Sequence, residues 1–327
     1  MTRYTFVGVV LAVVLGGAPC TILACTSFAV YSGRTLYGMN FDYPPCELQF
    51  SLEEHRAGCV FIGSFWMGDH YGRTVGMNDQ GLFASCQMVF PAQASAEEPK
   101  ANELYIWNAF YEGLQSCSRV VQVSDFIAEK RLVQYPSLGL HDLFADPEGS
   151  AMVIESGESG NVVTASDGPF MVMTNFPNGD FRGVDYREVH GDGAGRYQSA
   201  YATIEKRFDN FDVDDALDVL RQTAQSTGSF PTLYSLVFDP TAREIYIAVE
   251  RDFDHIWRVS LDDQSIESFY GFDEPISLPM MASEGVLASA LQGYVPTQAR
   301  HGWWRPAMVI TALLAIGLGL ALLLMRQ

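Results

Sequence analysis

The junction between Ala24 and Cys25 is the feature that most restricts how this chain can fold. Before it, Arg3 precedes an apolar run over residues 6–15, and the small residue Ala24 ends a segment typical of a secretory signal peptide, residues 1–24. Directly after it, Cys25-Thr-Ser-Phe-Ala-Val-Tyr is rich in the β-branched and aromatic residues that favour a strand. Cleavage after Ala24 would therefore give a mature chain whose first residue already enters a β-sheet.

The order of the remaining periodic segments predicts the fold class. Period-two patterns and strand-rich composition predict strands over residues 25–31, 34–41, 58–65, 82–90, 138–145, 151–155, 170–174, 232–239, 244–250 and 255–259. Helical periodicity covers residues 102–114, 195–208 and 213–223. Strands and helices thus come in blocks and not in strict alternation, which indicates an α+β layered fold and argues against βαβ units.

The C-terminal part of the sequence predicts a membrane anchor. Residues 307–325 are apolar and uncharged, and as a helix they would span about 28 Å, close to the thickness of a bilayer core. Small and polar residues over 283–306 indicate a linker, so residues 25–282 are predicted to form one domain. We expect an exported protein, membrane-anchored through this helix, with its domain on the outer (periplasmic, extracellular or lumenal) side. Arg300 and Arg305 oppose that topology, and we expect the signal peptide to outweigh them.

The charge of the chain excludes one class of partner. Acidic residues outnumber basic residues 39 to 20, and the resulting formal charge of -19 repels phosphate backbones. Nucleic acid is therefore not expected as a partner. The histidines form no HExxH motif and the cysteines no CxxC motif, so no metal or other cofactor is expected.

Cys25 would carry two reactive groups after cleavage at Ala24. Its α-amino group, with an ordinary pKa of about 7.7 to 8.0, can take the proton of its own thiol without help from a histidine. Three alternatives stay open. Ile22-Leu23-Ala24-Cys25 also matches a lipoprotein cleavage box, which would leave Cys25 lipidated, Cys25 can be an inert thiol, or it can pair with His141 or His190 as in papain-like enzymes.

The other cysteines of the mature chain allow two states. Cys46, Cys59, Cys86 and Cys117 can form up to two disulfides in an oxidising compartment, or remain buried thiols.

Several short motifs then occur in a recognisable order. They are Cys25-Thr-Ser-Phe, Tyr37-Gly-Met-Asn-Phe-Asp42, Gly76-Met-Asn-Asp-Gln-Gly-Leu82, Asp146-Pro-Glu-Gly-Ser, Val153-Ile-Glu155, Met173-Thr-Asn175-Phe-Pro177, Gly195-Arg196-Tyr197 and Thr232-Leu-Tyr-Ser235. In this order the chain resembles the choloylglycine hydrolase and penicillin V acylase family of linear amide hydrolases. The resemblance implies a four-layer αββα sandwich, hydrolysis of a small N-acyl amide by Cys25 through a thioester, and no cofactor.

The resemblance also assigns roles to individual residues. Asp42 matches the aspartate that accepts a hydrogen bond from the nucleophile's amino group, and Asn175 matches the asparagine that donates to the oxyanion. Arg196 matches an arginine close to the aspartate and the thiolate, where a cation favours ionised sulfur. A second oxyanion donor is expected from a backbone N–H among residues 87–89.

One position departs from the family pattern. Met39 stands immediately before Asn-Phe-Asp42, where the family usually has an arginine. This loss disfavours strongly anionic substrates, and it suggests that Met39 faces a lipid-like acyl chain. It also supports an alternative function, a membrane-anchored binding protein of the same fold that has lost turnover.

Overall fold

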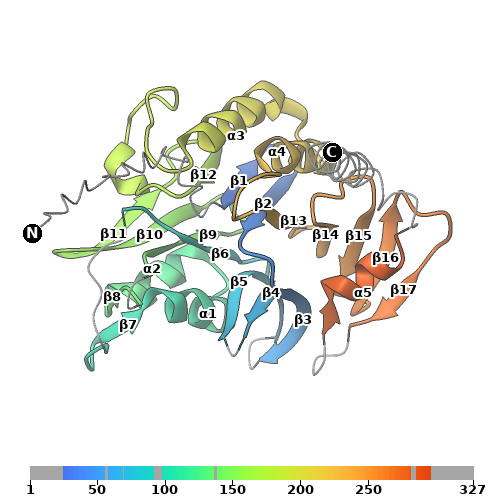
Figure 1. The fold of residues 1–327 in the computed structure, drawn as a ribbon. Helices are drawn as coiled ribbons and strands as arrows, with labels where there is room; N and C mark the ends of the chain where they lie inside the picture. The colour runs from blue at the N-terminus through green and yellow to red at the C-terminus, as the bar shows by residue number, and fades with distance from the viewer. Residues whose placement is uncertain are drawn as a thin grey trace, which may run out of the picture.

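Two antiparallel sheets of eight strands each form the centre of the molecule (Figure 1). The computed structural model describes residues 25–55, 58–68, 70–91, 98–135, 138–280 and 285–295. Sheet A has the order β12 (Phe170–Met173), β1 (Thr26–Tyr31), β2 (Thr35–Asp42), β13 (Thr232–Asp239), β14 (Glu244–Val249), β15 (Ile256–Ser260), β16 (Ser265–Tyr270), β17 (Ser277–Pro279). Sheet B has the order β11 (Gly160–Ala165), β10 (Ala151–Gly157), β9 (Leu140–Ala145), β6 (Phe83–Met88), β5 (His70–Asn78), β4 (Gly58–Met67), β3 (Glu47–His55), β18 (Val286–Leu287).

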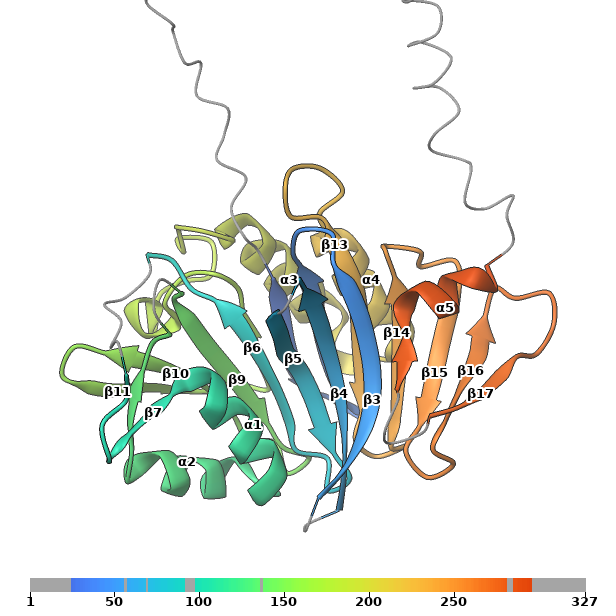
Figure 2. The same cartoon turned by 60° about the horizontal axis from the view of Figure 1, so that its bottom comes forward.

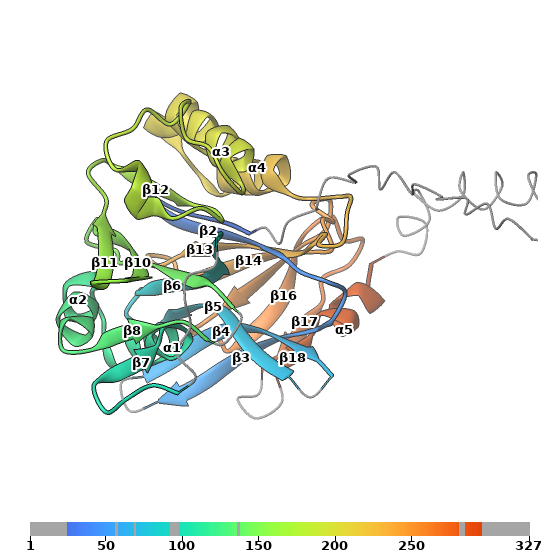
Figure 3. The same ribbon diagram turned by 60° about the vertical axis from the view of Figure 1, so that its left-hand side comes forward.

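Helices cover the outer face of each sheet, as Figure 3 shows. Helices α3 (Ala194–Arg207) and α4 (Val213–Thr223) pack on sheet A, where Phe28 and Val30 point toward them. Helices α1 (Ile106–Ser116) and α2 (Val120–Ala128) pack on sheet B, beside the short parallel pair β7 (Glu103–Tyr105) and β8 (Arg131–Val133). A third apolar core fills the space between the sheets. The expected αββα sandwich is thus present.

Local sequence accounts for the turns that start and end these elements. Asp146 Oδ1 accepts hydrogen bonds from the backbone N–H groups of Glu148 and Ser150, which closes the predicted turn between β9 and β10. Asp212 accepts from the N–H of Asp215 at 3.0 Å and thereby caps the N-terminus of α4.

Several elements were not predicted from the sequence. They are β3, β5, β7, β8, β11, β16, β17, β18, α2 and α5 (Ala288–Gly293), together with the short 3-10 turns at Asn178–Phe181 and Phe208–Asn210. In β3, Leu48, Phe50 and Leu52 alternate with polar residues, a period-two pattern that the prediction overlooked. In β5, Gly72, Arg73 and Gly76 interrupt the apolar pattern, and pairing with β4 and β6 defines the strand.

The predicted linker is wrong for residues 285–295. Val286 and Leu287 pair with Phe50 and Gln49 at the edge of sheet B, and α5 follows with Leu291 completely buried. The burial of these apolar side chains makes the segment part of the domain, although its small and polar residues suggested a linker. The signal peptide (1–24) and the membrane helix (307–325) lie outside the described residues. In the part that is described, no helix is long and apolar enough to cross a bilayer.

Candidate active site

Cys25 lies immediately before β1, next to the end of β2. The register pairs Thr26 with Asn40, which brings Cys25 beside Asp42 at the same edge of sheet A. The Cys25 Sγ atom lies 3.9 Å from the backbone oxygen of Asp42, and the residue is almost fully buried. Thr232, the first residue of β13, pairs with Asp42 of β2. This end of sheet A therefore brings together residues that are about 200 positions apart in the chain.

Asn175 and Arg196 hold the backbone of Cys25. The backbone N–H of Cys25 donates to Asn175 Oδ1 at 2.9 Å, and Arg196 Nη2 donates to the same oxygen at 2.8 Å. Arg196 Nη1 also donates to the Cys25 carbonyl oxygen and, at 3.0 Å, to Thr26 Oγ1. The structure therefore brings together three of the predicted site residues in one direct hydrogen-bond network.

A glycine allows Arg196 to approach the site. Gly193, the residue before α3, has φ of +80°. A Cβ atom built there would lie 2.7 Å from Arg196 Nη2 and 2.9 Å from Thr174 Oγ1. A side chain at this position would thus be strained and would displace the guanidinium, which explains why the loop before α3 requires glycine.

Asp42 is buried close by, but its carboxylate has other partners. Thr232 Oγ1 donates to Asp42 Oδ1, and Gln225 Nε2 donates to Asp42 Oδ2 at 2.9 Å. In the full chain the Cys25 nitrogen is part of a peptide bond and carries one hydrogen, which it donates in the hydrogen bond to Asn175 Oδ1. Sequence reasoning missed Thr232 and Gln225, although Thr232 begins one of the motifs that carry the resemblance.

Burial dominates the electrostatics of the cluster. It raises the pKa of the Cys25 thiol to about 12, and the Asp42 carboxylate adds to this rise. It also raises the pKa of Asp42 to about 7, against the lowering effect of Arg196 and the hydrogen bonds from Thr232 and Gln225. Burial lowers the pKa of Arg196, opposed by Asp42, yet a guanidinium remains protonated in proteins. At neutral pH the thiol keeps its proton and needs a base to become a nucleophile.

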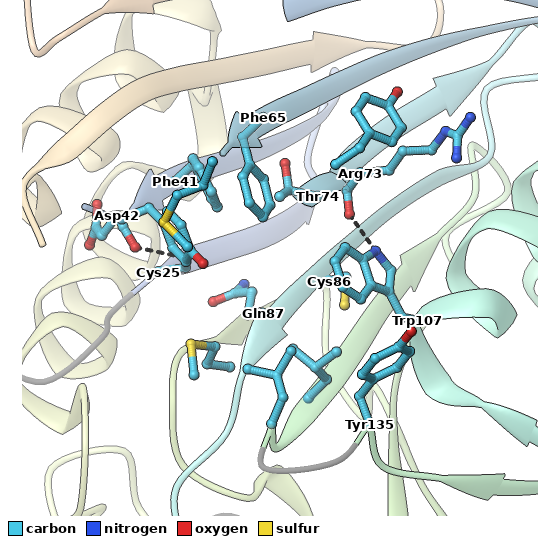
Figure 4. A pocket seen from close by; sticks show the side chains of 16 residues that line it. Cys25, Phe41, Asp42, Phe65, Arg73, Thr74, Cys86, Gln87, Trp107 and Tyr135 are labelled. Atoms are coloured by element: carbon cyan, nitrogen blue, oxygen red, sulfur yellow. Dashed lines mark hydrogen bonds between the residues drawn. The ribbon is translucent and has the colours of Figure 1, made fainter. Parts of the chain in front are cut away.

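A cavity of about 350 Å³ opens in front of Cys25 (Figure 4). It occupies the gap where β5 and β6 diverge, since these strands pair only from Val75 to Met77 and from Phe83 to Ser85. Its lining is mostly aromatic and apolar: Cys25, Phe41, Asp42, Tyr43, Phe65, Met67, Tyr71, Arg73, Thr74, Cys86, Gln87, Met88, Trp107, Tyr135, Leu138 and Leu140. The cavity therefore suits an apolar group placed next to the thiol.

The aromatic wall of this cavity is preassembled. The Phe41 ring stacks on Tyr43 and Phe65, with centroid distances of 5.3 and 5.5 Å. Trp107 is fixed by a hydrogen bond from its Nε1 to the backbone oxygen of Arg73 at 2.8 Å. None of these aromatic residues was predicted to belong to the site: Phe41 lies inside the Tyr37–Asp42 motif but was given no role, and no short motif marks the others.

The expectation for Met39 is wrong. Its side chain is fully buried in the core between the sheets and is not part of the cavity wall. Phe41, two residues further along β2 and on the same face, takes the position facing the cavity.

The geometry of β6 indicates which backbone N–H can be the second oxyanion donor. The Val89 N–H donates to the Gly139 oxygen, so the N–H and C=O of Met88 point to the opposite side of the strand. On that side the Met88 oxygen accepts a hydrogen bond from Asn175 Nδ2 at 2.7 Å. Among residues 87–89, the Met88 N–H thus points away from β9, to the side of the strand on which Asn175 lies.

Gln87 adds a polar contact that the sequence did not reveal. With its amide nitrogen turned toward Cys25, it donates to the Cys25 carbonyl oxygen at 3.2 Å and accepts from Ser27 Oγ at 2.6 Å. Gln87 thus ties β6 to the start of β1 across the two sheets.

Neither histidine of the papain-like alternative bonds to the thiol. His141 Nδ1 lies 3.3 Å from Glu155 Oε1, and His190 Nδ1 lies 3.3 Å from the Glu188 oxygen. All five cysteines of the described chain are free thiols, so the disulfide alternative is not realised here. Among the described residues, no three His, Cys, Asp or Glu side chains are grouped as metal ligands.

Comparison with known proteins identifies chains with a similar fold. No family model and no curated protein matches the sequence. A mutant of conjugated bile acid hydrolase from Clostridium perfringens matches in structure with a TM-score of 0.60 and 17% identity, covering 80% of this chain and 98% of that one. A penicillin V acylase from Agrobacterium tumefaciens matches with a TM-score of 0.55 and 14% identity, covering 75% and 90%. The described part of this chain therefore has the same fold as conjugated bile acid hydrolase and penicillin V acylase.

Proposed function

We propose that this protein is a cysteine amidase that hydrolyses the linear amide bond of a small N-acyl substrate after residues 1–24 have been removed. The observation that carries the proposal is the position of Cys25. Its sulfur borders an apolar cavity, while its backbone nitrogen is fixed by Asn175 on the opposite, polar side. Matching structures include a bile acid hydrolase and a penicillin acylase, whose names denote amide-cleaving enzymes, and this supports the reaction class.

The proposed reaction begins with proton transfer inside Cys25. The new α-amino group takes the thiol proton as Sγ attacks the amide carbonyl carbon. Asn175 Nδ2, which has a second hydrogen besides the one given to Met88, and the Met88 N–H stabilise the oxyanion. The ammonium group then protonates the leaving nitrogen as the C–N bond breaks. Water adds to the thioester, the C–S bond breaks, and the carboxylic acid leaves with the thiol restored.

Asp42 and Arg196 have supporting roles in this proposal. Once cleavage gives the nitrogen additional hydrogens, Asp42 lies close enough to Cys25 to act on them through its charge. Arg196 fixes the Asn175 amide and the Cys25 carbonyl, so the nucleophile and the oxyanion donor keep one relative position. Its permanent charge also favours the ionised sulfur.

The cavity favours a neutral, apolar acyl group. Arg73 is the cationic residue in its described lining, and this side chain is already engaged with Glu53 at 3.3 Å and with the face of Tyr111. We therefore expect kcat/KM to be higher for neutral N-acyl amides than for strongly anionic conjugates of similar size. A preference for the anionic conjugates would overturn this assignment of the substrate.

Two measurements on one preparation test the proposed function. A mass spectrum of the mature protein should show Cys25 as the first residue with a free amine, and a panel of chromogenic N-acyl amides should be hydrolysed. A diacylglyceryl mass on Cys25 would instead establish the lipoprotein alternative. Absence of turnover in protein that starts at a free Cys25 would overturn the amidase.

The second candidate is a binding protein of the same fold without turnover. Met39 favours it, because an apolar side chain packed in the core replaces the cation usual at this position in the family. In that case an N-acyl amide should bind with unchanged affinity to Cys25→Ala and to the unaltered protein, and neither should release product.

A further inference from the structure

One end of the sandwich contains both the active-site cavity and many of the exposed apolar side chains. We call it the Cys25 end. In sheet A, β1 and β15 begin there and β2 and β14 end there. In sheet B, β5 begins there and β4 and β6 end there. Five of the eight large apolar side chains exposed in the described chain lie there: Trp66, Met67, Tyr135, Tyr270 and Tyr294. We call these five residues the aromatic rim.

Part of the rim borders the cavity, and the rest lies farther along the same end of the sandwich. Met67 and Tyr135 line the cavity, and Trp66 lies beside them with its ring 4.6 Å from that of Tyr71. Trp66 and Tyr135 are each 43% exposed and Tyr270 is 63% exposed. Tryptophan and tyrosine combine a large apolar surface with a polar tip, and they are enriched where proteins meet the headgroup region of a bilayer.

The described chain also ends at the Cys25 end. Leu287 pairs with Gln49, which pairs with Ser64, and α5 continues from there toward the end where β4 finishes (Figure 2). Tyr294 packs against Trp257 at the start of β15, with ring centroids 5.9 Å apart. The last described residue, Val295, is therefore at the same end as the cavity mouth.

The length of chain that follows restricts which end can face a membrane. Residues 296–306 separate Val295 from the apolar segment 307–325. Even fully extended, a chain of this length reaches only about 40 Å. A domain of this size has a diameter of nearly 50 Å by the usual scaling of the radius of gyration. If the apolar segment spans a bilayer, the tether keeps the Cys25 end, and not the opposite end, next to the membrane.

From these observations we propose that the aromatic rim rests in the headgroup region of a neutral lipid bilayer, so that the cavity opens directly onto the membrane. Charge decides the type of lipid. Asp254, Asp273 and Glu274 are exposed in the loops of the Cys25 end, and the whole chain carries -19. Anionic lipids would be repelled, whereas zwitterionic phosphatidylcholine is compatible with the rim. This surface would deliver lipid-like acyl groups to Cys25 without passage through water.

Quenching of tryptophan fluorescence by brominated lipids tests the docking surface directly. The full chain is reconstituted in phosphatidylcholine vesicles whose acyl chains are brominated near the headgroup. The fluorescence of Trp66 is obtained by subtracting the fluorescence of Trp66→Phe from that of the unaltered protein. The subtraction removes the contribution of the other tryptophans. We expect this difference signal to be quenched. A second reporter, Tyr270→Trp in the Trp66→Phe background, should be quenched as well.

Val121 supplies the matched control. It is exposed on α2, whose first N–H, from Val120, bonds Asp146 at the opposite end of sheet B. The fluorescence that Val121→Trp adds to the Trp66→Phe background should remain unquenched. Quenching of the Val121 reporter to the same extent, or absence of quenching at Trp66 and Tyr270, would overturn the proposal. Protection of Trp66 in detergent by a second copy of the chain, without lipid quenching, would overturn it too.

A catalytic experiment deepens this result and rests on the proposed amidase function. Trp66 and Tyr270 do not line the cavity, so Trp66→Ser with Tyr270→Ser should leave kcat/KM for a water-soluble N-acyl amide unchanged. For a long-chain amide embedded in vesicles, kcat/KM should fall by at least about tenfold, because two large apolar contacts with the bilayer are removed. An equal effect on both substrates would contradict delivery from the bilayer. A protein without any amidase activity would fail here but could still show the lipid quenching.

Discussion

Behind Cys25, on the side of α3 and the beginning of β13, polar side chains are closely hydrogen-bonded, whereas in front of it the cavity is mostly apolar. The polar side consists of Asn175, Arg196, Asp42, Thr232 and Gln225, joined to one another or to Cys25 by hydrogen bonds. The apolar side consists of stacked rings and aliphatic side chains that leave a space of about 350 Å³.

This difference between the polar and the apolar side of Cys25 separates chemical catalysis from binding of the acyl group. Fixed donors and acceptors act on the charge that develops during acyl transfer, so the polar side should govern kcat for every substrate. Dispersion and the hydrophobic effect lack direction and scale with contact area, so the apolar side should govern which acyl groups bind. Substitutions on the two sides are therefore expected to differ in kind as well as in size.

The largest effect should come from blocking the nitrogen of Cys25. A chain that keeps two additional residues before Cys25 has an amide there, without a basic lone pair, so turnover should fall by roughly 10² to 10⁴, the range for lost general-base catalysis. Rates are compared with protein processed to start at Cys25, and thiol titration verifies that the sulfur is intact in both. Equal turnover would place the base elsewhere and would remove the polar side from the chemical step.

The next effect concerns the two functions of the Asn175 amide. Asn175→Ala should lower kcat by roughly 10² to 10³, as for the loss of one preorganised oxyanion donor. Asn175→Asp keeps an acceptor for the Cys25 nitrogen but has no N–H to donate. A similar loss in both variants, measured with several acyl groups, would identify Asn175 as a donor. Full activity of Asn175→Asp would show that it only positions Cys25.

On the apolar side, we expect a smaller effect that depends on the substrate. Phe65→Leu should lower kcat/KM for long or aromatic acyl groups by about tenfold, the equivalent of roughly 1.4 kcal/mol of lost contact, and should spare short acyl groups. Phe61→Leu is the matched control, since Phe61 is buried on the same face of β4 without lining the cavity. A uniform loss across acyl lengths would mean that the apolar side also supports the chemical step.

The smallest effect should appear in stability and not in turnover. Burial raises the pKa of Asp42 to about 7 from its ordinary value of 3.8, so folding favours the protonated carboxyl. The unaltered protein should lose stability relative to Asp42→Asn as pH rises from about 4 through about 7. Chemical denaturation at pH 4 and pH 8 measures this difference, with the exposed Asp254→Asn as the control for losing one carboxylate. A difference independent of pH would contradict the buried position of this charge.

Much of the fold could be predicted from the sequence because its elements have strong periodicity. The hairpin of β1 and β2, the pair β9 and β10, and helices α3 and α4 all occur close to their predicted positions. Elements such as β5 and α5 could not be predicted, since their residues are compatible with several local structures. Only pairing with β4 and β6, or burial against β3, selects the one observed.

The candidate site, too, could be predicted only in part. The sequence predicted a strand starting at Cys25, and in the structure β1 begins one residue later, while the family resemblance indicated Asp42, Asn175 and Arg196 as neighbours. The structure places these residues around Cys25, while their catalytic roles remain predictions. Hydrogen-bonding residues can be recognised in short motifs because their function requires a particular residue type at a particular place in the sequence.

The cavity and the aromatic rim were decided by tertiary structure alone. Phe41, Phe65, Trp107 and Tyr135 come from β2, β4, α1 and the segment after β8, and nothing in their spacing predicts a common wall. Apolar contact needs only shape and area, which many residue types can supply at many positions, so no motif records it. The space in front of Cys25 exists because β5 and β6 diverge, and that divergence is a property of the assembled sheet.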